Sequence, residues 1–136
     1  MSKRLVREII AAANHIGYLA TIDNGAPRVR PIDMYINDKD NFLTATFANS
    51  KKVKQLEKCK LVEICFYDGH EQLVRIAGEI EFVVDRGQKE DFARLNPHVN
   101  NDFQGVDDPY YTLLRLCPKK VEFMKTGDYK YITVDW

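Results

Sequence analysis

The chain has 136 residues, and its 20 lysines and arginines equal its 20 aspartates and glutamates in number. This length suits one domain, which we expect to span residues 1–136 and to bury roughly two-thirds of its unfolded surface. A net charge of zero argues against a nucleic-acid or anionic-membrane partner, because such partners require a basic face.

The cysteines and histidines give no metal or disulfide pattern. The three cysteines have no CxxC spacing, and the three histidines lie far apart in the sequence. We therefore expect no metal site and a reducing, cytoplasmic setting. The first residues are charged and lack an apolar secretory core, and no apolar run is long enough to cross a bilayer, so no membrane insertion is predicted.

The first third of the chain reads as a helix followed by a hairpin. Apolar residues over 3–15 have the spacing of an amphipathic helix. A short strand over 18–22 leads to the DNG sequence at 23–25, a strong turn signal because Asn and Gly accept positive φ. The returning strand is predicted over 28–36, and Pro31 within it removes a backbone donor, which indicates a sheet edge or a bulge.

A third strand, over 42–46, runs into a lysine-rich helix that begins at Ser50. Ser50 is a good N-cap, and a helix N-terminus carries free N–H groups and partial positive charge. Lys51 and Lys52 add two charges at that same end, which is locally unfavourable unless an anion binds there. The stretch therefore reads either as a phosphate site or as a solvated basic helix.

The rest of the chain reads mainly as strands. Gly78 in the middle of the longest strand suggests a bulge, and Arg75 on the same strand is expected to pair with Glu63 on its neighbour. The expected elements are strands over 61–67 and 72–84, a helix over 86–95, a loop over 98–109, strands over 111–116 and 120–125 broken at Pro118, and a last strand over 129–136.

The pattern as a whole predicts a mainly β fold. Six to eight strands, mostly antiparallel because their turns are tight, and two or three short helices favour a small barrel with helices over its ends. A three-strand meander would place residues 28–36 beside 42–46. Arg28 and Arg30 could then converge with the lysine-rich helix end on one anion, since Arg offers a planar fork for phosphate and Lys a point charge.

Taken in order, these segments resemble the FMN-binding split-barrel superfamily, which includes pyridoxamine 5′-phosphate oxidase and the general-stress-protein relatives. The resemblance covers roughly residues 5–85. The matching pieces are the leading helix, G-x-L-A-T at 17–21, P-x-x-R-P at 27–31, S-[RK]-K-x-x-x-L at 50–56 and V-R-I-x-G at 74–78.

The resemblance implies a split β-barrel that forms a homodimer, with two FMN sites in clefts between the subunits. Carried over to this chain, the implied cofactor-binding residues are Arg30, Pro31, Ile32, Ala45, Thr46, Ser50, Lys51 and Lys52. No catalytic side chain is implied. Trp136 and Tyr110 could cover a flavin from the partner chain, but we expect core or dimer packing for both.

The C-terminal part departs from true pyridoxamine phosphate oxidases. It reads RGQKEDFARLNPHVNN and YKYITVDW where those enzymes carry basic substrate-binding segments, so the vitamin oxidase activity is not carried over. The resemblance instead implies an FMN-dependent oxidoreductase that passes electrons from NADH or NADPH to a small acceptor. The alternatives are a non-catalytic flavin-binding or stress-response protein, and a relative that holds haem or the deazaflavin F420 in the same cleft.

Overall fold

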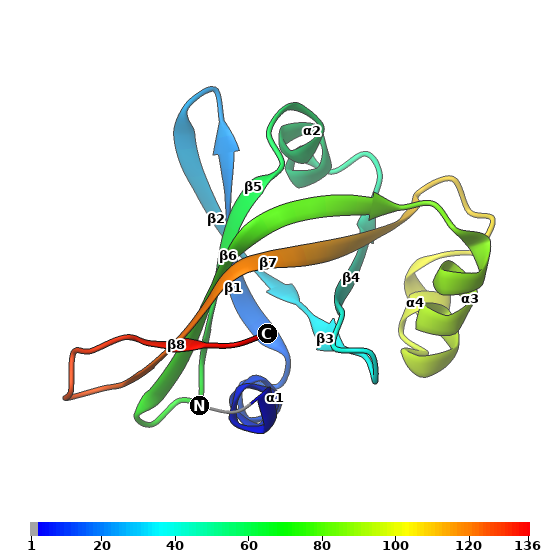
Figure 1. Ribbon diagram of the computed structural model, residues 1–136. Helices are drawn as coiled ribbons and strands as arrows, with labels where there is room; N and C mark the ends of the chain where they lie inside the picture. The colour runs from blue at the N-terminus through cyan, green and yellow to red at the C-terminus, as the bar shows by residue number, and fades with distance from the viewer. Residues whose placement is uncertain (1–2) are drawn as a thin grey trace.

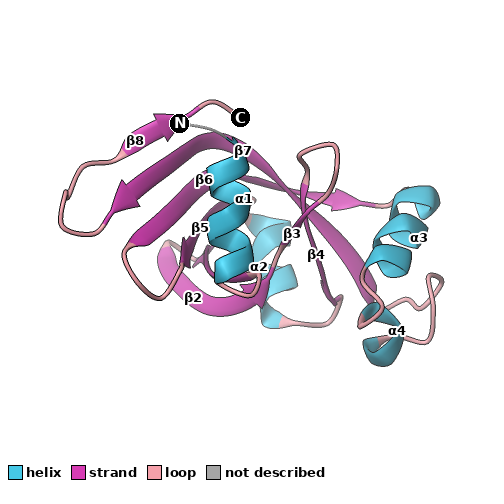
Figure 2. Cartoon of the chain, turned by 90° about the horizontal axis from the view of Figure 1, so that it is seen from below, coloured by secondary structure: helices cyan, strands magenta, loops and turns pink. Residues whose placement is uncertain are grey.

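The computed structural model describes residues 3–136 and contains one curled antiparallel sheet with helices at its ends (Figures 1 and 2). The strand order is β2-β1-β5-β6-β7-β4-β3, and β8 pairs with β7. The expected mainly β split-barrel fold is confirmed. The elements are α1 (Lys3–Ala12), β1 (Ile16–Asp23), β2 (Ala26–Asp33), β3 (Tyr35–Ile36), β4 (Phe42–Phe47), α2 (Lys51–Lys58), β5 (Leu61–Tyr67), β6 (Gln72–Val83), α3 (Arg86–Leu95), α4 (Val99–Asp102), β7 (Tyr111–Lys125) and β8 (Ile132–Val134).

The core has two parts. The larger cluster lies between α1 and the inward faces of β5 and β6, where alternate residues such as Ile64 and Ile76 are fully buried. Figure 2 shows α1 lying across these strands. The smaller cluster lies near α3 and α4 and includes Phe92 and Phe103. Strands β1, β5 and β6 bury alternate residues, whereas the edge strand β2 has no buried residue.

The predicted hairpin turn, the sheet edge at Pro31 and the ion pair of Arg75 are confirmed. The turn between β1 and β2 has Asn24 at a φ of 50° and Gly25 at a φ of 83°, the left-handed conformations that a two-residue hairpin loop requires. β2 pairs only with β1 among the described strands, so Pro31 does lie on a sheet edge. The predicted pair of Arg75 with Glu63 is present at 3.6 Å, together with a shorter contact from Arg75 to Glu122 at 3.1 Å.

The predicted meander is only partly correct. The segment 28–36 is divided into β2 and the two-residue β3, and only β3 pairs with β4. β4 instead pairs along its whole length with β7. The reason is that β7 arrives from the far end of the chain, which no local pattern reveals.

The predicted break at Pro118 is wrong, because β7 runs without interruption through this residue. Pro118 faces Gly78, and the register of β6 against β7 shifts between Ala77 and Gly78. The bulge expected at Gly78 is therefore present, and it accommodates a proline that has no N–H to donate. The loop predicted over 98–109 contains the short helix α4, and the last strand is shorter than predicted.

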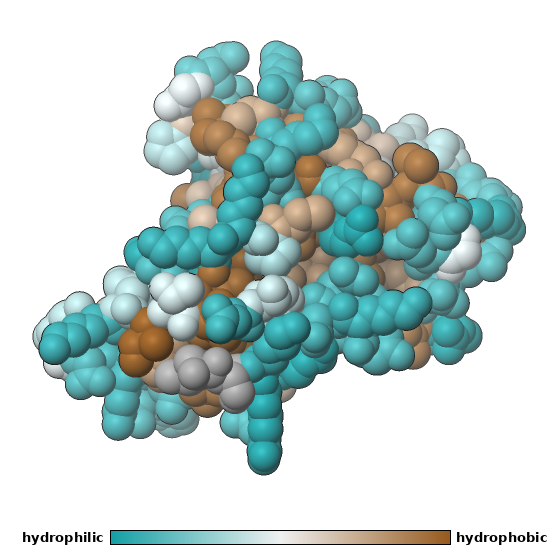
Figure 3. Space-filling view, in the orientation of Figure 1, coloured by the Kyte–Doolittle hydropathy of each residue, from teal (hydrophilic) through white to brown (hydrophobic). Residues whose placement is uncertain are grey.

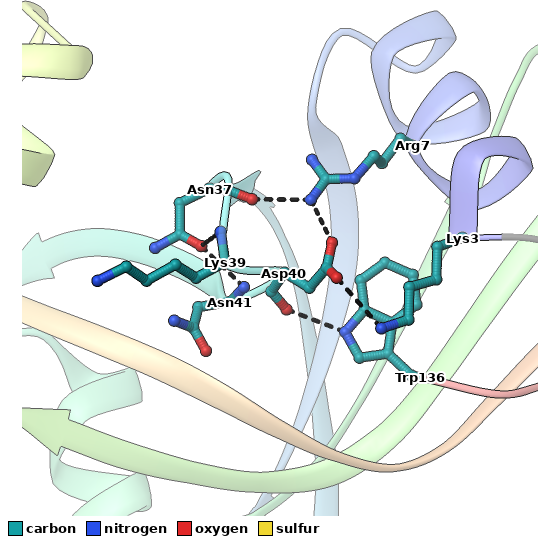
Figure 4. A network of polar contacts seen from close by, with 7 residues as sticks. All are labelled: Lys3, Arg7, Asn37, Lys39, Asp40, Asn41 and Trp136. Atoms are coloured by element: carbon teal, nitrogen blue, oxygen red, sulfur yellow. Dashed lines mark hydrogen bonds and ion pairs between the residues drawn. The ribbon is translucent and has the colours of Figure 1, made fainter.

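The C-terminal residue is fastened to the turn between β3 and β4 (Figure 4). The Trp136 ring lies 4.7 Å from the Phe42 ring, and its indole nitrogen donates a hydrogen bond to the Asp40 carbonyl oxygen at 2.9 Å. The Asp40 carboxylate accepts hydrogen bonds from Lys3 and Arg7 of α1. The core packing expected for Trp136 is confirmed, and it joins both ends of the chain to one turn.

Candidate functional site

The start of α2 is held in place by its own N-cap. The Ser50 hydroxyl accepts a hydrogen bond from the Val53 backbone N–H, as its position predicts. Val53 and Leu56 are buried and fix the inner face of the helix. Lys51 is exposed, whereas Lys52, the next residue of the helix, points towards Thr46 at the end of β4.

The shortest hydrogen bonds of Arg30 go to oxygen atoms of β1 and α2. Its Nη1 donates to the Leu19 carbonyl oxygen at 3.1 Å and to Thr21 Oγ1 at 2.7 Å. Its Nη2 donates to Gln55 Oε1 at 2.8 Å. All these acceptors are uncharged, so the guanidinium is oriented but its charge is not neutralised. Burial lowers the pKa of Arg30.

Lys52 lies close to Arg30 although both side chains are cationic. The Lys52 ammonium donates to the Thr46 hydroxyl at the end of β4. Burial lowers the pKa of Lys52, and the positive charge of Arg30 lowers it further. Within residues 3–136, no carboxylate lies within ion-pairing distance of either cation. Two like charges are thus held together with free capacity for an anion.

Two hollows meet at Lys52. The first, which we call the α2 hollow, has a volume of about 590 Å³ and is lined by Asp23, Arg28, Val29, Arg30, Ser50, Lys51, Lys52 and Gln55. The second, which we call the β4 cleft, has a volume of about 400 Å³ and is lined by Ile16, Pro31, Ile32, Asp33, Tyr35, Thr44, Ala45, Thr46, Phe47, Lys52, His98, Asp102 and Phe103. Both volumes lie within the range of about 300–1,000 Å³ that is usual for small-molecule sites.

Every cofactor-binding residue expected from the sequence lines one of these hollows. Arg30, Ser50 and Lys51 line the α2 hollow, and Lys52 lines both. The remaining four line the β4 cleft, and they are Pro31, Ile32, Ala45 and Thr46. The structure therefore brings the predicted residues together even though β2 and β4 are not neighbours in the sheet.

Several residues that line the two hollows belong to no motif that marks them in the sequence. Gln55 accepts hydrogen bonds from both Thr21 and Arg30, and it lies one turn after Lys51 on the same helix. An i,i+4 spacing from Lys51 could have placed it on the same face of α2. Tyr35 and His98 also line the β4 cleft, but 62 residues separate them in the sequence, so no local pattern shows that they are close.

Two of the three histidines meet at Tyr35. The His15 and Tyr35 rings are stacked with centroids 4.6 Å apart, and the His98 ring lies 5.6 Å from Tyr35 on a tilted plane. Burial raises the pKa of the Tyr35 hydroxyl, and the charge of Asp33 raises it further. Tyr35 thus stays protonated at neutral pH and can donate a hydrogen bond into the cleft.

The curled sheet and the cationic pair beside a partly apolar cleft define a split-barrel protein with a candidate anion site. The profile of the pyridoxamine 5′-phosphate oxidase family matches residues 3–125, and the chain belongs to this family. No helix within residues 3–136 is long and apolar enough to cross a membrane.

Solved structures agree with this assignment. A NimC/NimA family protein from Clostridium acetobutylicum superposes with a TM-score of 0.79 and 25% identity, over 96% of this chain and 89% of that one. General Stress Protein 26 from Bacillus anthracis superposes with a TM-score of 0.73 and 20% identity, over 95% and 98%. A heme binding protein from Mycobacterium smegmatis has a TM-score of 0.71 and 14% identity, over 94% and 55%. No curated protein has a significant match in sequence.

Proposed function

We propose that this protein binds FMN across the α2 hollow and the β4 cleft and acts as an oxidoreductase. The observation that supports this proposal is the pair formed by Arg30 and Lys52. Two cations that are partly desolvated and lack a carboxylate partner raise the free energy of the folded protein. A bound phosphate ester would offset that cost through charge-assisted hydrogen bonds.

The lining of the two hollows fits the parts of FMN. Arg30, Ser50, Lys51 and Lys52 would hold the phosphate, with the free N–H groups of the first turn of α2 as further donors. Pro31, Ile32, Ala45 and Thr46 would hold the ribityl chain and the ring. Because β2 is an edge strand, its unpaired backbone groups are available to a ring that both donates and accepts hydrogen bonds.

Bound FMN would supply the redox chemistry, taking electrons from NADH or NADPH and giving them to a small-molecule acceptor. The residues of this chain would bind and orient the cofactor and exclude water from its ring. The apolar and aromatic wall formed by Ile32, Phe47 and Phe103 suits the last of these tasks. The cytoplasm, where reduced nicotinamides are formed, is the proposed setting.

We further propose that the protein is a homodimer with its cofactor sites at the subunit boundary. Tyr18 on the outer face of β1 is 53% exposed, and its partner in the sheet is Pro31, which lines the β4 cleft. Leu61 and Tyr67 on β5 lie on the same face of the sheet, together with the ion pair of Glu63 and Arg75. A second subunit that covers Tyr18 would therefore also border the cleft.

Titration of FMN into the apoprotein, followed by flavin fluorescence, tests the proposal. The double variant Arg30→Ala/Lys52→Ala should bind FMN at least about 100-fold more weakly, because two charge-assisted hydrogen bonds are lost. The matched control is Lys54→Ala/Lys58→Ala, which removes two charges from α2 outside both hollows and should bind normally. Unchanged affinity in the Arg30/Lys52 variant would refute the site.

Reduction of the bound flavin by NADH or NADPH without oxygen then separates an oxidoreductase from a carrier. Bleaching of the flavin absorbance supports the enzyme. A flavin that binds tightly but stays oxidised with both nucleotides supports the non-catalytic alternative.

Haem is the second candidate, and the position of His98 favours it. Haem iron requires an axial ligand, and His98 lines the β4 cleft. Parallel titrations with haem and F420 address these alternatives. A Soret band that appears with haem and is lost in His98→Ala, with no FMN binding, would replace the flavin proposal.

A further inference from the structure

The β4 cleft has two chemically different ends. Lys52 and Thr46 form one end, where the cleft joins the α2 hollow. Tyr35 pairs with Leu43 in the sheet, three residues before Thr46, which corresponds to about 10 Å along the strand. We call the end formed by Tyr35 and His98, with Asp33 beside them, the tyrosine end.

The opposite wall of the cleft follows the same direction. His98 contacts Tyr35, whereas Phe103, just after α4, lies 4.7 Å from Phe47 at the end of β4. Asp102 also lines this wall and lies one helical turn after His98. The segment 98–103 therefore lines the cleft along its length. The two ends of the cleft can each bind a different chemical group of a ligand.

The tyrosine end has unused hydrogen-bonding capacity. The Tyr35 ring contacts the rings of His15, His98 and Phe92, and its hydroxyl makes no hydrogen bond to any described residue. Tyr35 lines both the β4 cleft and a second hollow beside α3, whereas Asp33 lines only the β4 cleft. Because the charge of Asp33 raises the pKa of the Tyr35 hydroxyl, we assign this donor to the cleft side.

The charges of the cleft are also unbalanced between its ends. Lys52 lies at one end, and Asp33 and Asp102 are in the lining away from it. Neither aspartate forms an ion pair with any residue in the described part of the chain. Both aspartates are exposed, so solvent screens their charges, but the end they border still favours an uncharged or cationic ring over an anionic one.

We propose that the tyrosine end is the binding site for the nicotinamide ring of the electron donor. This inference rests on the proposed function, since it assigns a place to the donor. The ring carries a carboxamide, whose oxygen can accept from the Tyr35 hydroxyl and whose amino group can donate to the Asp33 carboxylate. The ring is uncharged when reduced and cationic when oxidised, and both states suit two unpaired carboxylates.

Three probes of the same size test the charge preference. Nicotinamide is uncharged, 1-methylnicotinamide is cationic and nicotinate is anionic. Each is titrated into isotopically labelled apoprotein and followed by NMR, so the readout does not depend on bound flavin. Nicotinate should bind at least about tenfold more weakly than the other two. The shifts should centre on Tyr35 and His98 and leave Arg30 unchanged.

Two variants separate the residues involved. Asp33→Asn/Asp102→Asn should weaken nicotinamide binding only slightly, because an amide oxygen can still accept from the carboxamide, and should reduce the discrimination against nicotinate to about threefold or less. Tyr35→Phe keeps the ring between the two imidazoles and removes only the hydroxyl, so it should weaken the binding of nicotinamide and 1-methylnicotinamide alike. Thermal unfolding of each variant checks that the fold is retained.

The outcomes distinguish this inference from the proposed function. Equal or tighter binding of nicotinate, unchanged discrimination in the double aspartate variant, shifts confined to other surfaces, or no saturable shift with any probe would each overturn it. An apoprotein that shows the expected order but does not bind FMN would support the ring site and reject the flavin. A protein that binds FMN but treats the three probes alike would reject the ring site only.

Discussion

Gln55 of α2 binds Arg30 of β2 through an uncharged amide. Its Oε1 atom accepts hydrogen bonds from Thr21 and Arg30 at 2.7 and 2.8 Å. An amide in this place orients the guanidinium but leaves its charge available to a ligand. A carboxylate of the same shape would orient it equally well and neutralise it.

We therefore expect Gln55→Glu to bind FMN about tenfold or more weakly while its free energy of unfolding is unchanged or higher. FMN titration and denaturant unfolding of the apoprotein measure the two quantities. The matched control is Gln88→Glu on α3, which lies outside the α2 hollow. An FMN affinity equal to that of the wild type would mean that the charge of Arg30 is not used.

The lowered pKa of Lys52 predicts a pH dependence of stability. Burial and Arg30 disfavour its charged form in the folded apoprotein, so folding is penalised below the folded-state pKa. This penalty disappears as the pH rises through the pKa of a lysine in the unfolded chain, about 10.4. Wild-type protein should therefore gain stability relative to Lys52→Met between pH 7 and about pH 10.

Denaturant unfolding of the two proteins across this range measures the difference. Lys54→Met is the control, because Lys54 is exposed and lines neither hollow. A gap between wild type and Lys52→Met that stays constant with pH would show that Lys52 is not desolvated.

At the site, local motifs could be predicted and long-range neighbours could not. Ser50, Lys51 and Lys52 follow from capping and charge within one helical turn. The resemblance and the expected meander predict that Arg30 lies with them. In the structure the meander is incomplete, and hydrogen bonds to Thr21 and Gln55 hold Arg30 beside α2 instead. Tyr35 and His98 approach each other only after the sheet has formed, and no local pattern marks them.

The bulge at Gly78 is the element on which the long pairing of β6 with β7 depends. A Cβ atom at this position would lie 2.1 Å from the carbonyl oxygen of Cys117, a contact that only backbone movement could relieve. The shift in register places Pro118, which has no N–H to donate, opposite Gly78. The absence of a side chain at Gly78 thus allows the backbone of β7 to approach closely at Cys117 and Pro118.

Gly78→Ala should lower the free energy of unfolding by about 3 kcal/mol or more, at or above the usual range for overpacking. Chemical denaturation measures this loss. Gly87→Ala in the first turn of α3 is the comparison, since its nearest new contact is a flexible side chain at 3.3 Å and the change should stay within about 1 kcal/mol. Similar stabilities for the two variants would show that the strands can part at the bulge.

The sequence predicted most elements because their signals are local. The strands expected over 61–67 and 72–84 are β5 and β6, and the helix expected over 86–95 is α3 with the same bounds. Pro118 was misread as a break because the partner that tolerates it is 40 residues away. Figure 1 shows this dependence directly, since β7 lies between β6 and β4 and joins the two halves of the sheet.

At the scale of the whole molecule, the exposed apolar side chains mark the surface that a second copy would cover. Figure 3 shows hydrophobic residues, in brown, among hydrophilic ones, in teal, on the face that Figure 1 views. Tyr18, Leu61 and Tyr67 are each more than 40% exposed on the outward faces of β1 and β5. An apolar surface of this kind on a β-sheet is typical of a homodimer interface.

We expect the protein in solution to have a mass near twice the 15.8 kDa of the chain, as measured by light scattering after gel filtration. Tyr18→Glu should shift the mass towards one chain, because it places a charge in the apolar contact. It should also weaken FMN binding, since Tyr18 pairs with Pro31 of the β4 cleft. Leu95→Glu, at the C-terminal end of α3 and 61% exposed, lies on none of the strands of this face and should change neither property. A Tyr18→Glu protein that stays dimeric would show that the dimer interface lies on another surface. A monomeric variant with full FMN affinity would show that one subunit forms the whole FMN site.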